Sequence, residues 1–259
     1  MSAKQLDFVI KECRIFESGC SLMRLKPADG AELPDCRPGQ FVQVLTKCQD
    51  VFLRRPISIC DVFNGELTLF IKPVGKGSEW LVSQPIGTKL NLITPLGTGF
   101  SIDGDVNGKK ILLVGGGVGC APLVYLSKVL SNIGANVTVA IGGRTKRDVE
   151  GLEDLYSGAN PTAFSTEDGS YGEKGLITQN SVFSRKYDRI YCCGPTPMMK
   201  AIARIAVEKE IWCEVSLENM MACGLGACLC CVQETSDNGN VCVCTEGPVF
   251  NINRLTSWI

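Results

Sequence analysis

The sequence predicts three units in series: an antiparallel β-barrel, a parallel α/β sheet and a small cysteine-rich module. Short strand-like runs separated by turn residues extend to about residue 102, and beyond them strands alternate with helices. Six of the 15 cysteines then fall between Cys223 and Cys244. We therefore expect domains at residues 1–104, 105–216 and 217–259.

The barrel is predicted from the spacing of its apolar residues. Residues 40–45, 56–60 and 66–72 alternate between apolar and polar side chains or form short apolar runs, with Gly, Pro, Asn and Asp between the runs. Many short strands with such turn signals are typical of an antiparallel barrel. The polar, turn-rich residues 101–110 mark the end of this unit.

The α/β sheet is predicted from a change of rhythm at residue 109. We expect five strands, at residues 111–114, 136–141, 161–166, 189–193 and 211–216. Helices are expected at residues 121–133, 148–156 and 197–208. Strands that alternate with helices form parallel sheets with right-handed crossovers.

Composition narrows the classes of function. The formal net charge is −1 and no basic stripe is present, so we expect no nucleic-acid partner. The first residues lack the apolar segment of a signal peptide, and the longest uncharged run, 111–127, contains the Gly and Pro of a strand, a turn and a helix, so we expect no membrane partner. The odd number of cysteines, mostly scattered, indicates a reducing cytoplasm. Because the chain has no histidine, a cofactor or cysteine must carry its chemistry.

Two turns in the α/β unit have the residues of a dinucleotide site. The first follows the strand 111–114 and is rich in glycine, at Gly115, Gly116, Gly117 and Gly119. Glycines let the backbone approach a pyrophosphate, and the next helix directs its free amides toward it. The second turn follows the fourth strand and consists of Cys193, Gly194 and Pro195. Ordinary tight turns are the alternative in both places.

The barrel unit carries a candidate phosphate site. Arg54 and Arg55 come just before Ser58, and an arginine there could clamp a phosphate while the hydroxyl bonds a flavin or its phosphate. Residues 75–78 could present backbone amides to a second phosphate. An exposed basic corner with a surface turn is the alternative.

The most specific motif lies in the last fifth of the chain. Cys223, Cys228 and Cys231 have the spacing C-x4-C-x2-C, and Cys244 follows a short loop later. This is the plant-type spacing of [2Fe–2S] ligands. Four thiolates also suit structural zinc, but zinc sites usually contain two C-x2-C pairs, and only Cys228 and Cys231 form such a pair here.

Residues around this motif refine the site. Gly224 and Gly226 suit a loop wrapped closely round a cluster, with backbone amides directed at its sulfurs. Cys230 lies between ligands and is expected to point away. Cys242 is the alternative to Cys244 as the fourth ligand.

Taken in this order, the motifs resemble those of the electron-transfer subunits of NAD-dependent (type B) dihydroorotate dehydrogenase. The resemblance covers essentially the whole chain and is most specific in the tail, at residues 216–228 and 244–250. It implies a Greek-key FAD-binding barrel, then a parallel-sheet domain that binds NAD, then a small C-terminal [2Fe–2S] module.

The resemblance also assigns residues. It places FAD on a set of barrel residues: Arg55, Pro56, Ile57, Ser58, Phe70, Ile71, Lys72, Gly77 and Ser78. It makes four cysteines the cluster ligands: Cys223, Cys228, Cys231 and Cys244. The residues expected to bind NAD are Gly115, Gly116, Gly117, Gly119, Arg144, Cys193, Gly194 and Pro195.

Two positions depart from the family pattern. The barrel strand of the family usually carries an aromatic residue where Ile71 lies. Arg144, with Lys146 and Arg147, follows the second strand of the sheet, where an acidic residue would bind the ribose 2′-hydroxyl. A basic cluster there could accept a 2′-phosphate, so NADP is the alternative to NAD.

The implied function is electron transfer in pyrimidine (UMP) biosynthesis. Dihydroorotate would be oxidised on a separate FMN-containing catalytic subunit, in a cytoplasmic heterotetramer with two copies of each subunit. Electrons would reach the cluster singly, and FAD would collect two of them and pass a hydride to NAD⁺. Trp258 and residues 248–250 are candidates for the subunit interface, and packing on the core is the alternative.

Two other functions use the same motifs. A reductase subunit that serves a hydrogenase, a transhydrogenase or a ferredoxin would share the barrel and the nucleotide turns, and only the cysteine-rich tail argues against it. A zinc-stapled interaction module without catalysis belongs to another class of protein. A visible spectrum with flavin and [2Fe–2S] absorption would exclude the zinc module.

Overall fold

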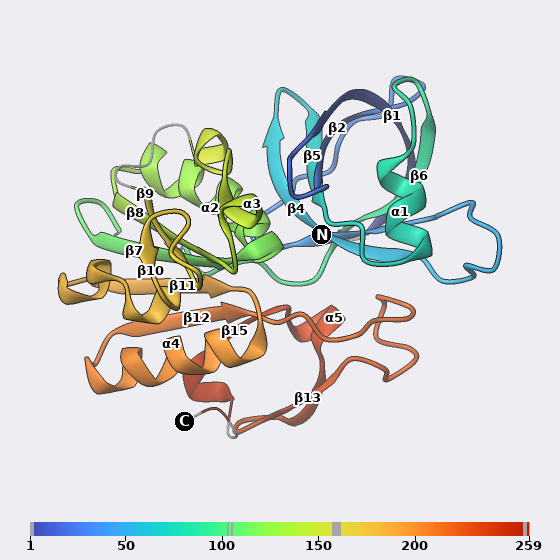
Figure 1. Ribbon diagram of the computed structural model, residues 1–259. Helices are drawn as coiled ribbons and strands as arrows, with labels where there is room; N and C mark the ends of the chain where they lie inside the picture. The colour runs from blue at the N-terminus through green and yellow to red at the C-terminus, as the bar shows by residue number, and fades with distance from the viewer. Residues whose placement is uncertain (1–2, 103, 105, 157–161, 256–257, 259) are drawn as a thin grey trace.

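A barrel stands beside an open sheet, and the C-terminal tail lies beneath the barrel (Figure 1). The computed structural model describes residues 3–102, 104, 106–156, 162–255 and 258. Residues 1, 105, 161 and 259, at which we set limits of domains or of a strand, lie outside the described residues. Among the described residues, no helix is long and apolar enough to span a membrane.

Six antiparallel strands close the barrel in the order β1-β2-β5-β4-β3-β6. Their bounds are β1 Lys4–Ile15, β2 Ser21–Pro27, β3 Phe41–Val44, β4 Arg55–Phe63, β5 Glu66–Ile71 and β6 Lys89–Leu96, with the short helix α1 Lys76–Val82 between β5 and β6. Alternate side chains fill the interior, among them Val42 and Val44, which are completely buried. The predicted antiparallel barrel is confirmed.

The second sheet has seven strands in the order β10-β9-β8-β7-β11-β12-β15. The strands are β7 Lys110–Gly116, β8 Asn136–Gly143, β9 Thr162–Thr166, β10 Glu173–Lys174, β11 Arg189–Cys193, β12 Trp212–Ser216 and β15 Val249–Asn251. All pairs are parallel except β12 with β15. The main helices, α2 Ala121–Asn132 and α4 Thr196–Glu208, follow β7 and β11 as expected.

The helix expected at 148–156 is interrupted. Only a single turn forms, α3 Lys146–Val149, and a 3₁₀ turn, η2 Glu153–Tyr156, follows it. Gly151 between them has a φ of +81°, in the left-handed region, which ends a right-handed helix.

The tail is built into the sheet. It contains the hairpin β13 Val232–Thr235 and β14 Gly239–Cys242, the turn α5 Val243–Glu246, then β15, and the 3₁₀ turn η5 Ile252–Arg254. Because β15 pairs with β12, the boundary drawn at residue 217 divides segments that share one sheet.

The apolar end of the tail packs inward. Val249, Phe250 and Trp258 are all at least nine-tenths buried. Phe250 and Trp258 belong to one hydrophobic core of the molecule, and Val249 belongs to another. The interface expected from Trp258 and residues 248–250 is therefore wrong for these side chains. Packing on the core, the alternative, is what the structure has, because the β12–β15 pairing turns these residues inward.

Two polar contacts hold the barrel against the sheet. Glu214 on β12 is buried, and its carboxylate accepts hydrogen bonds from the backbone N–H and the hydroxyl of Ser101, at 2.8 and 2.6 Å. Lys128 on α2 donates to Asp61 on β4, with 2.5 Å between Nζ and Oδ2. These contacts join the barrel unit to β12 and to α2 of the α/β unit.

Candidate functional site

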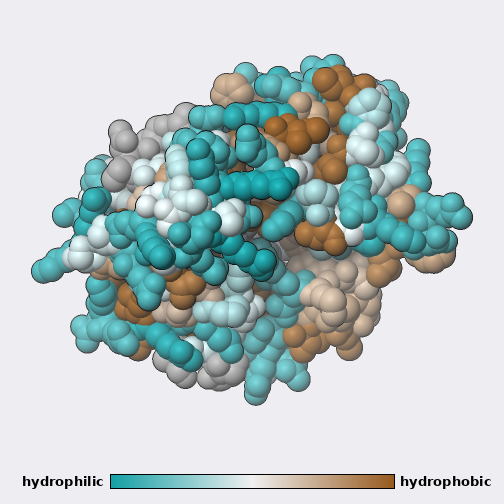
Figure 2. Space-filling view, in the orientation of Figure 1, coloured by the Kyte–Doolittle hydropathy of each residue, from teal (hydrophilic) through white to brown (hydrophobic). Residues whose placement is uncertain are grey.

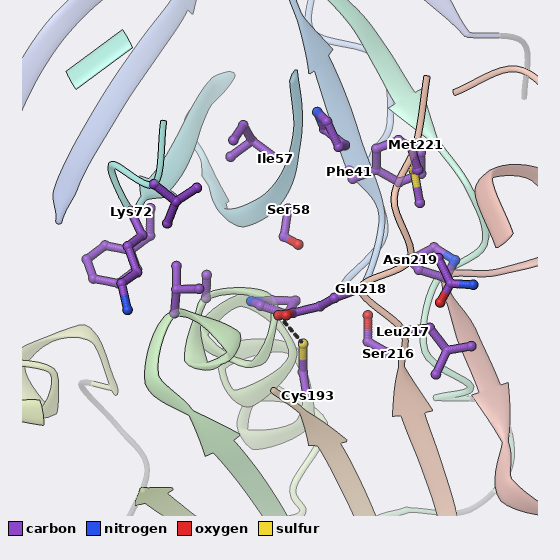
Figure 3. A pocket seen from close by; sticks show the side chains of 17 residues that line it. Phe41, Ile57, Ser58, Lys72, Cys193, Ser216, Leu217, Glu218, Asn219 and Met221 are labelled. Carbon is purple, nitrogen blue, oxygen red and sulfur yellow. Dashed lines mark hydrogen bonds between the residues drawn. The ribbon is translucent and has the colours of Figure 1, made fainter. Parts of the chain in front are cut away.

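A pocket of about 400 Å³ opens where the barrel, the sheet and the start of the tail meet (Figure 3). Its walls come from β4 and β5, from the turn before α2, from the end of β11 and from the residues after β12. Six residues assigned from the sequence line it: Pro56, Ile57, Ser58, Phe70, Lys72 and Cys193. The pocket thus brings the barrel motif and one nucleotide turn into a single cavity.

Strand alternation decides which residues of the end of β5 reach the pocket. Phe70 and Lys72 line it, and the Phe70 ring packs edge-to-face on Phe16 at 5.3 Å between centroids. Ile71 points the opposite way into the barrel core and is 1% exposed. The side chain of Ile71 therefore does not reach the pocket, although it was assigned to the flavin site.

The two neighbouring arginines have different roles. Arg54 is used within the barrel, since its guanidinium donates to the side-chain oxygen of Asn91 at 2.6 Å and to the Asn91 carbonyl at 3.1 Å. Arg55 lies against the first turn of α1, where a methyl group on Gly77 would be 2.6 Å from Arg55 Nε. The Ser78 hydroxyl accepts from the Val74 N–H at 2.8 Å. Arg55, Gly77 and Ser78 thus lie together beside the pocket, which Val74 lines.

The two nucleotide turns pack directly on each other. A methyl group on Gly119 would lie 2.5 Å from the carbonyl oxygen of Cys193, and one on Gly116 would lie 2.7 Å from Cδ of Pro195. A methyl group on Gly117 would meet no atom within 4 Å. Gly116 and Gly119 are needed for close packing of the two turns, and Gly117 presents the open side of the turn.

We expect Gly119→Ala to destabilise the fold by about 1–3 kcal/mol, because an added methyl group would overpack the contact between the turns. It should also weaken binding of NAD⁺. Urea unfolding and calorimetry measure the two effects. Gly75→Ala is the matched control, since a methyl group there meets nothing within 4 Å. Native stability in Gly119→Ala would contradict the packing role.

The pocket includes residues that were not predicted. Five of them lie within six positions at the end of β12 or just beyond it: Ser216, Leu217, Glu218, Asn219 and Met221. Because β12 is parallel to β11, its carboxyl end lies beside Cys193, with Cys193 opposite Ser216 in register. These residues could have been predicted from their position after a strand of the parallel sheet, since ligands of α/β sheets bind at the carboxyl ends of the strands.

Cys193 and Glu218 face each other in the pocket (Figure 3). The Cys193 thiol lies 3.9 Å from Glu218 Oε1. Burial raises the pKa of the Cys193 thiol. Partial burial between the pocket walls raises the pKa of the Glu218 carboxyl, whereas Cys193 and Lys72 act to lower it. Part of the Glu218 residue remains accessible to water.

The basic residues after β8 lie at the carboxyl edge of the sheet, away from the pocket. Arg147 Nε donates to the backbone carbonyl of Glu17 at 2.6 Å, and Lys146 pairs with Glu150 at 3.0 Å. Two of the three cations proposed for a 2′-phosphate are thus engaged elsewhere. Arg144 is exposed, and Asp168 lies next to it, with its backbone N–H on the Arg144 carbonyl at 3.2 Å.

The four candidate cluster ligands lie close together, three in the loop after β12 and Cys244 in α5. Cys223 interacts with Cys228, and Cys231 interacts with Cys244 and also with Cys242. Cys231 and Cys244 are buried, Cys223 is half-buried, and Cys228 is exposed. Within the described residues, no three His, Cys, Asp or Glu side chains are grouped to hold a single ion.

Backbone amides are directed at these sulfurs. Leu225 N–H donates to Cys223 Sγ at 3.3 Å, Gly226 N–H to Cys244 Sγ at 3.1 Å, and Cys244 N–H to Cys231 Sγ at 3.4 Å. The Leu225 bond lowers the pKa of Cys223 to about 6, whereas burial raises the pKa of Cys244 to about 12. The loop has the amide donors that an iron–sulfur cluster requires, so the donor set fits such a cluster.

The other two cysteines of the tail are Cys230 and Cys242. Cys230 is exposed, as Cys228 is. Cys242 Sγ lies 3.9 Å from the carbonyl oxygen of Gly226, whereas the N–H of the same residue points to Cys244. The amide therefore favours Cys244 as the fourth ligand.

Apolar side chains surround the cysteines on the surface. Met220, Leu225 and Leu229 are 84%, 53% and 66% exposed, and together we call them the cysteine-loop patch. Figure 2 shows tan and brown surface over this part of the tail, below the barrel. Large exposed apolar residues grouped round a functional site mark a contact surface.

A barrel joined to a nucleotide-binding sheet, with a pocket between them, defines the ferredoxin-reductase class of flavoproteins. The structure superposes on a chain of an NADH-dependent reduced ferredoxin-NADP oxidoreductase with a TM-score of 0.80 and 27% identity, covering 99% of this chain and 95% of that one. A ferredoxin reductase of carbazole 1,9a-dioxygenase gives 0.68 and 23% identity, over 82% and 67% of the two chains, and shows the fold alone.

The cysteine-rich tail and the sequence identify the family. Residues 218–256 match the iron–sulfur cluster binding domain of dihydroorotate dehydrogenase B. The dihydroorotate dehydrogenase B (NAD(+)) electron transfer subunit of Shouchella clausii is 38% identical, over 85% of this chain and 86% of its own length. That of Desulforamulus reducens is 41% identical, over 82% and 84%. The chain belongs to the family of dihydroorotate dehydrogenase B electron transfer subunits.

Proposed function

We propose that this chain is the electron transfer subunit of an NAD⁺-dependent dihydroorotate dehydrogenase, and that it passes electrons from dihydroorotate oxidation to NAD⁺ in pyrimidine biosynthesis. The observation that carries this proposal is the common wall of the pocket and the cysteine loop. Met221 lines the pocket two residues before Cys223, and Phe41 lines the pocket while packing in the same core as Cys231 and Cys244. A group in the pocket and a cluster at the cysteines would be separated by one layer of side chains.

The residues have distinct tasks in this proposal. Arg55, with Gly77 and Ser78, would hold the phosphates of FAD, and Ser58, Phe70 and Lys72 would form the wall against its ring. Four thiolates, those of Cys223, Cys228, Cys231 and Cys244, would hold the cluster. When bound, FAD and [2Fe–2S] supply the change between two-electron and one-electron transfer.

The turns at Gly115–Gly119 and Cys193–Pro195 would receive NAD⁺. Gly117, on the open side, allows the pyrophosphate to approach, and Cys193 brings the second turn to the pocket. We propose NAD⁺ over NADP⁺, because two of the three cations that could bind a 2′-phosphate, Lys146 and Arg147, already have partners within the protein.

The electron donor would be an FMN-containing catalytic subunit, in a cytoplasmic heterotetramer with two copies of each subunit. All 15 cysteines are free thiols, in keeping with a reducing compartment. We place the docking site of the catalytic subunit on the cysteine-loop patch, because electrons must enter at the cluster and this patch surrounds it.

Co-expression with a candidate FMN-containing catalytic subunit tests the function. We expect the purified complex to reduce NAD⁺ when dihydroorotate is supplied, and to reduce NADP⁺ far more slowly in a parallel assay. A complex that contains FMN, FAD and iron–sulfur cluster but reduces neither nucleotide would instead support a reductase subunit for another iron–sulfur flavoprotein.

A further inference from the structure

Gln43 lies in the wall between the pocket and the cysteine loop. On β3 it points to the same side as Phe41, because residues two apart on a strand share a face. Val42 and Val44 fill the barrel interior, and Phe41 lines the pocket. The side chain of Gln43 therefore leaves the outer face of the barrel beside the pocket.

The amide of Gln43 lies directly against the cysteine loop. A methyl group on Gly224 would be 2.6 Å from Gln43 Nε2 and 2.7 Å from Gln43 Cγ. Gly224 follows Cys223 and has a φ of +71°, in the left-handed region that favours glycine. The loop thus bends closely over the amide at the residue next to a cluster ligand.

This amide is buried without a hydrogen-bond partner. The side chain is 0% exposed, and within the described part of the chain neither Nε2 nor Oε1 has a partner. Burial of an unpaired amide is costly, and an apolar side chain of similar size would fill the space without that cost. The amide is therefore suited to a polar group that binds at this position.

Gln40, just before β3, has a side-chain amide that is hydrogen-bonded in the usual way. Its Oε1 accepts from the Arg37 N–H at 2.7 Å, and its Nε2 donates to the Gly97 carbonyl at 2.8 Å. Both ends of that amide are paired within the protein. The difference between these two glutamines on one edge of the barrel points to an acceptor for Gln43 outside the polypeptide.

We propose that Gln43 Nε2 donates a hydrogen bond to a sulfur of the [2Fe–2S] group at Cys223 and Cys228, and so raises its reduction potential. The reduced group carries one more negative charge than the oxidised group, so a donor stabilises it more. Hydrogen bonds to the sulfurs are among the factors that set these potentials. The inference rests on the proposed function. In it, Gln43 tunes the reduction potential of the cluster.

Redox titration followed by electron paramagnetic resonance tests this role in the cofactor-loaded chain. In Gln43→Met we expect the ratio of reduced to oxidised cluster at the native midpoint potential to fall about tenfold, which is a downward shift of about 59 mV for a one-electron carrier. Gln43→Glu keeps the length of the side chain but replaces the amide, and should shift the potential at least as far. Gln40→Met is the matched control: it should lower the unfolding temperature and leave the potential unchanged.

The outcomes separate this inference from the proposed function. Native potentials in both Gln43 variants, with full cluster content, would overturn the inference and assign the amide to a buried water. Loss of the cluster from both variants, but not from Gln40→Met, would support the contact. A native chain that takes up no iron–sulfur cluster would overturn the proposed function instead.

Discussion

We expect Cys228→Ser to remove the cluster and to stop electron flow from dihydroorotate to NAD⁺, while NADH should still reduce the FAD of the same chain. The thiolate pairs explain the first effect, since the loss of Cys228 leaves Cys223 without its partner. The second effect follows from geometry, because Cys228 is exposed in the tail and lines no part of the pocket. Iron analysis, the visible spectrum and the two activities of the complex measure these outcomes.

Cys230→Ser is the matched control for Cys228→Ser. It changes a neighbouring exposed thiol of the same loop that is not among the proposed ligands. The control should keep the cluster and the full dihydroorotate-dependent activity. Normal coupled activity in Cys228→Ser, or loss of the cluster in Cys230→Ser, would contradict the ligand assignment.

We expect Met220→Glu to weaken binding to the catalytic subunit and to leave the chain's own cofactors in place. A charge placed in the cysteine-loop patch would be buried on association without a partner, and the loss of an anchoring apolar residue costs about 2 kcal/mol or more. The dissociation constant should therefore rise by roughly 30-fold or more. Surface plasmon resonance with the immobilised catalytic subunit measures it.

Leu176→Glu serves as the control for Met220→Glu. Leu176, like Met220, is a large exposed apolar residue, with 55% of its surface accessible. It lies next to η3 (Ile177–Gln179) in the nucleotide-binding unit, away from the tail. Both variants should retain flavin and cluster absorption and NADH-dependent dye reduction. Unchanged affinity in Met220→Glu would move the docking site away from the patch.

Local patterns predicted the elements of this fold because its strands and helices are strongly periodic. The runs at 40–45 and 66–72 contain β3 and β5, and the rhythm from residue 109 contains β7 and β8. The interruption of the helix expected at 148–156 was not predicted, because a single left-handed glycine, Gly151, divides a stretch whose composition otherwise suits a helix. β15 was also missed, since three residues paired antiparallel at a sheet edge leave little pattern in the sequence.

Some residues of the candidate site could likewise be predicted from the sequence, and others could not. Ser58, Lys72 and Cys193 were found because each belongs to a motif or to an assigned strand. Glu218 and Gln43 were not, because they matter through neighbours that are distant along the chain. Glu218 meets Cys193, 25 positions earlier, and Gln43 meets Gly224. No local pattern encodes such contacts, which arise only when the tail folds back on the barrel.

The pairing of β15 with β12 has a consequence for the speed of electron transfer. A carrier domain on a flexible tether must search for its partner, so its rate falls as the solvent becomes more viscous. Here the segment that holds the cysteines is clamped at both ends, by β12 before it and by β15 after it. The gap that an electron crosses inside this chain is therefore set when the chain folds, and the crossing needs no diffusive step.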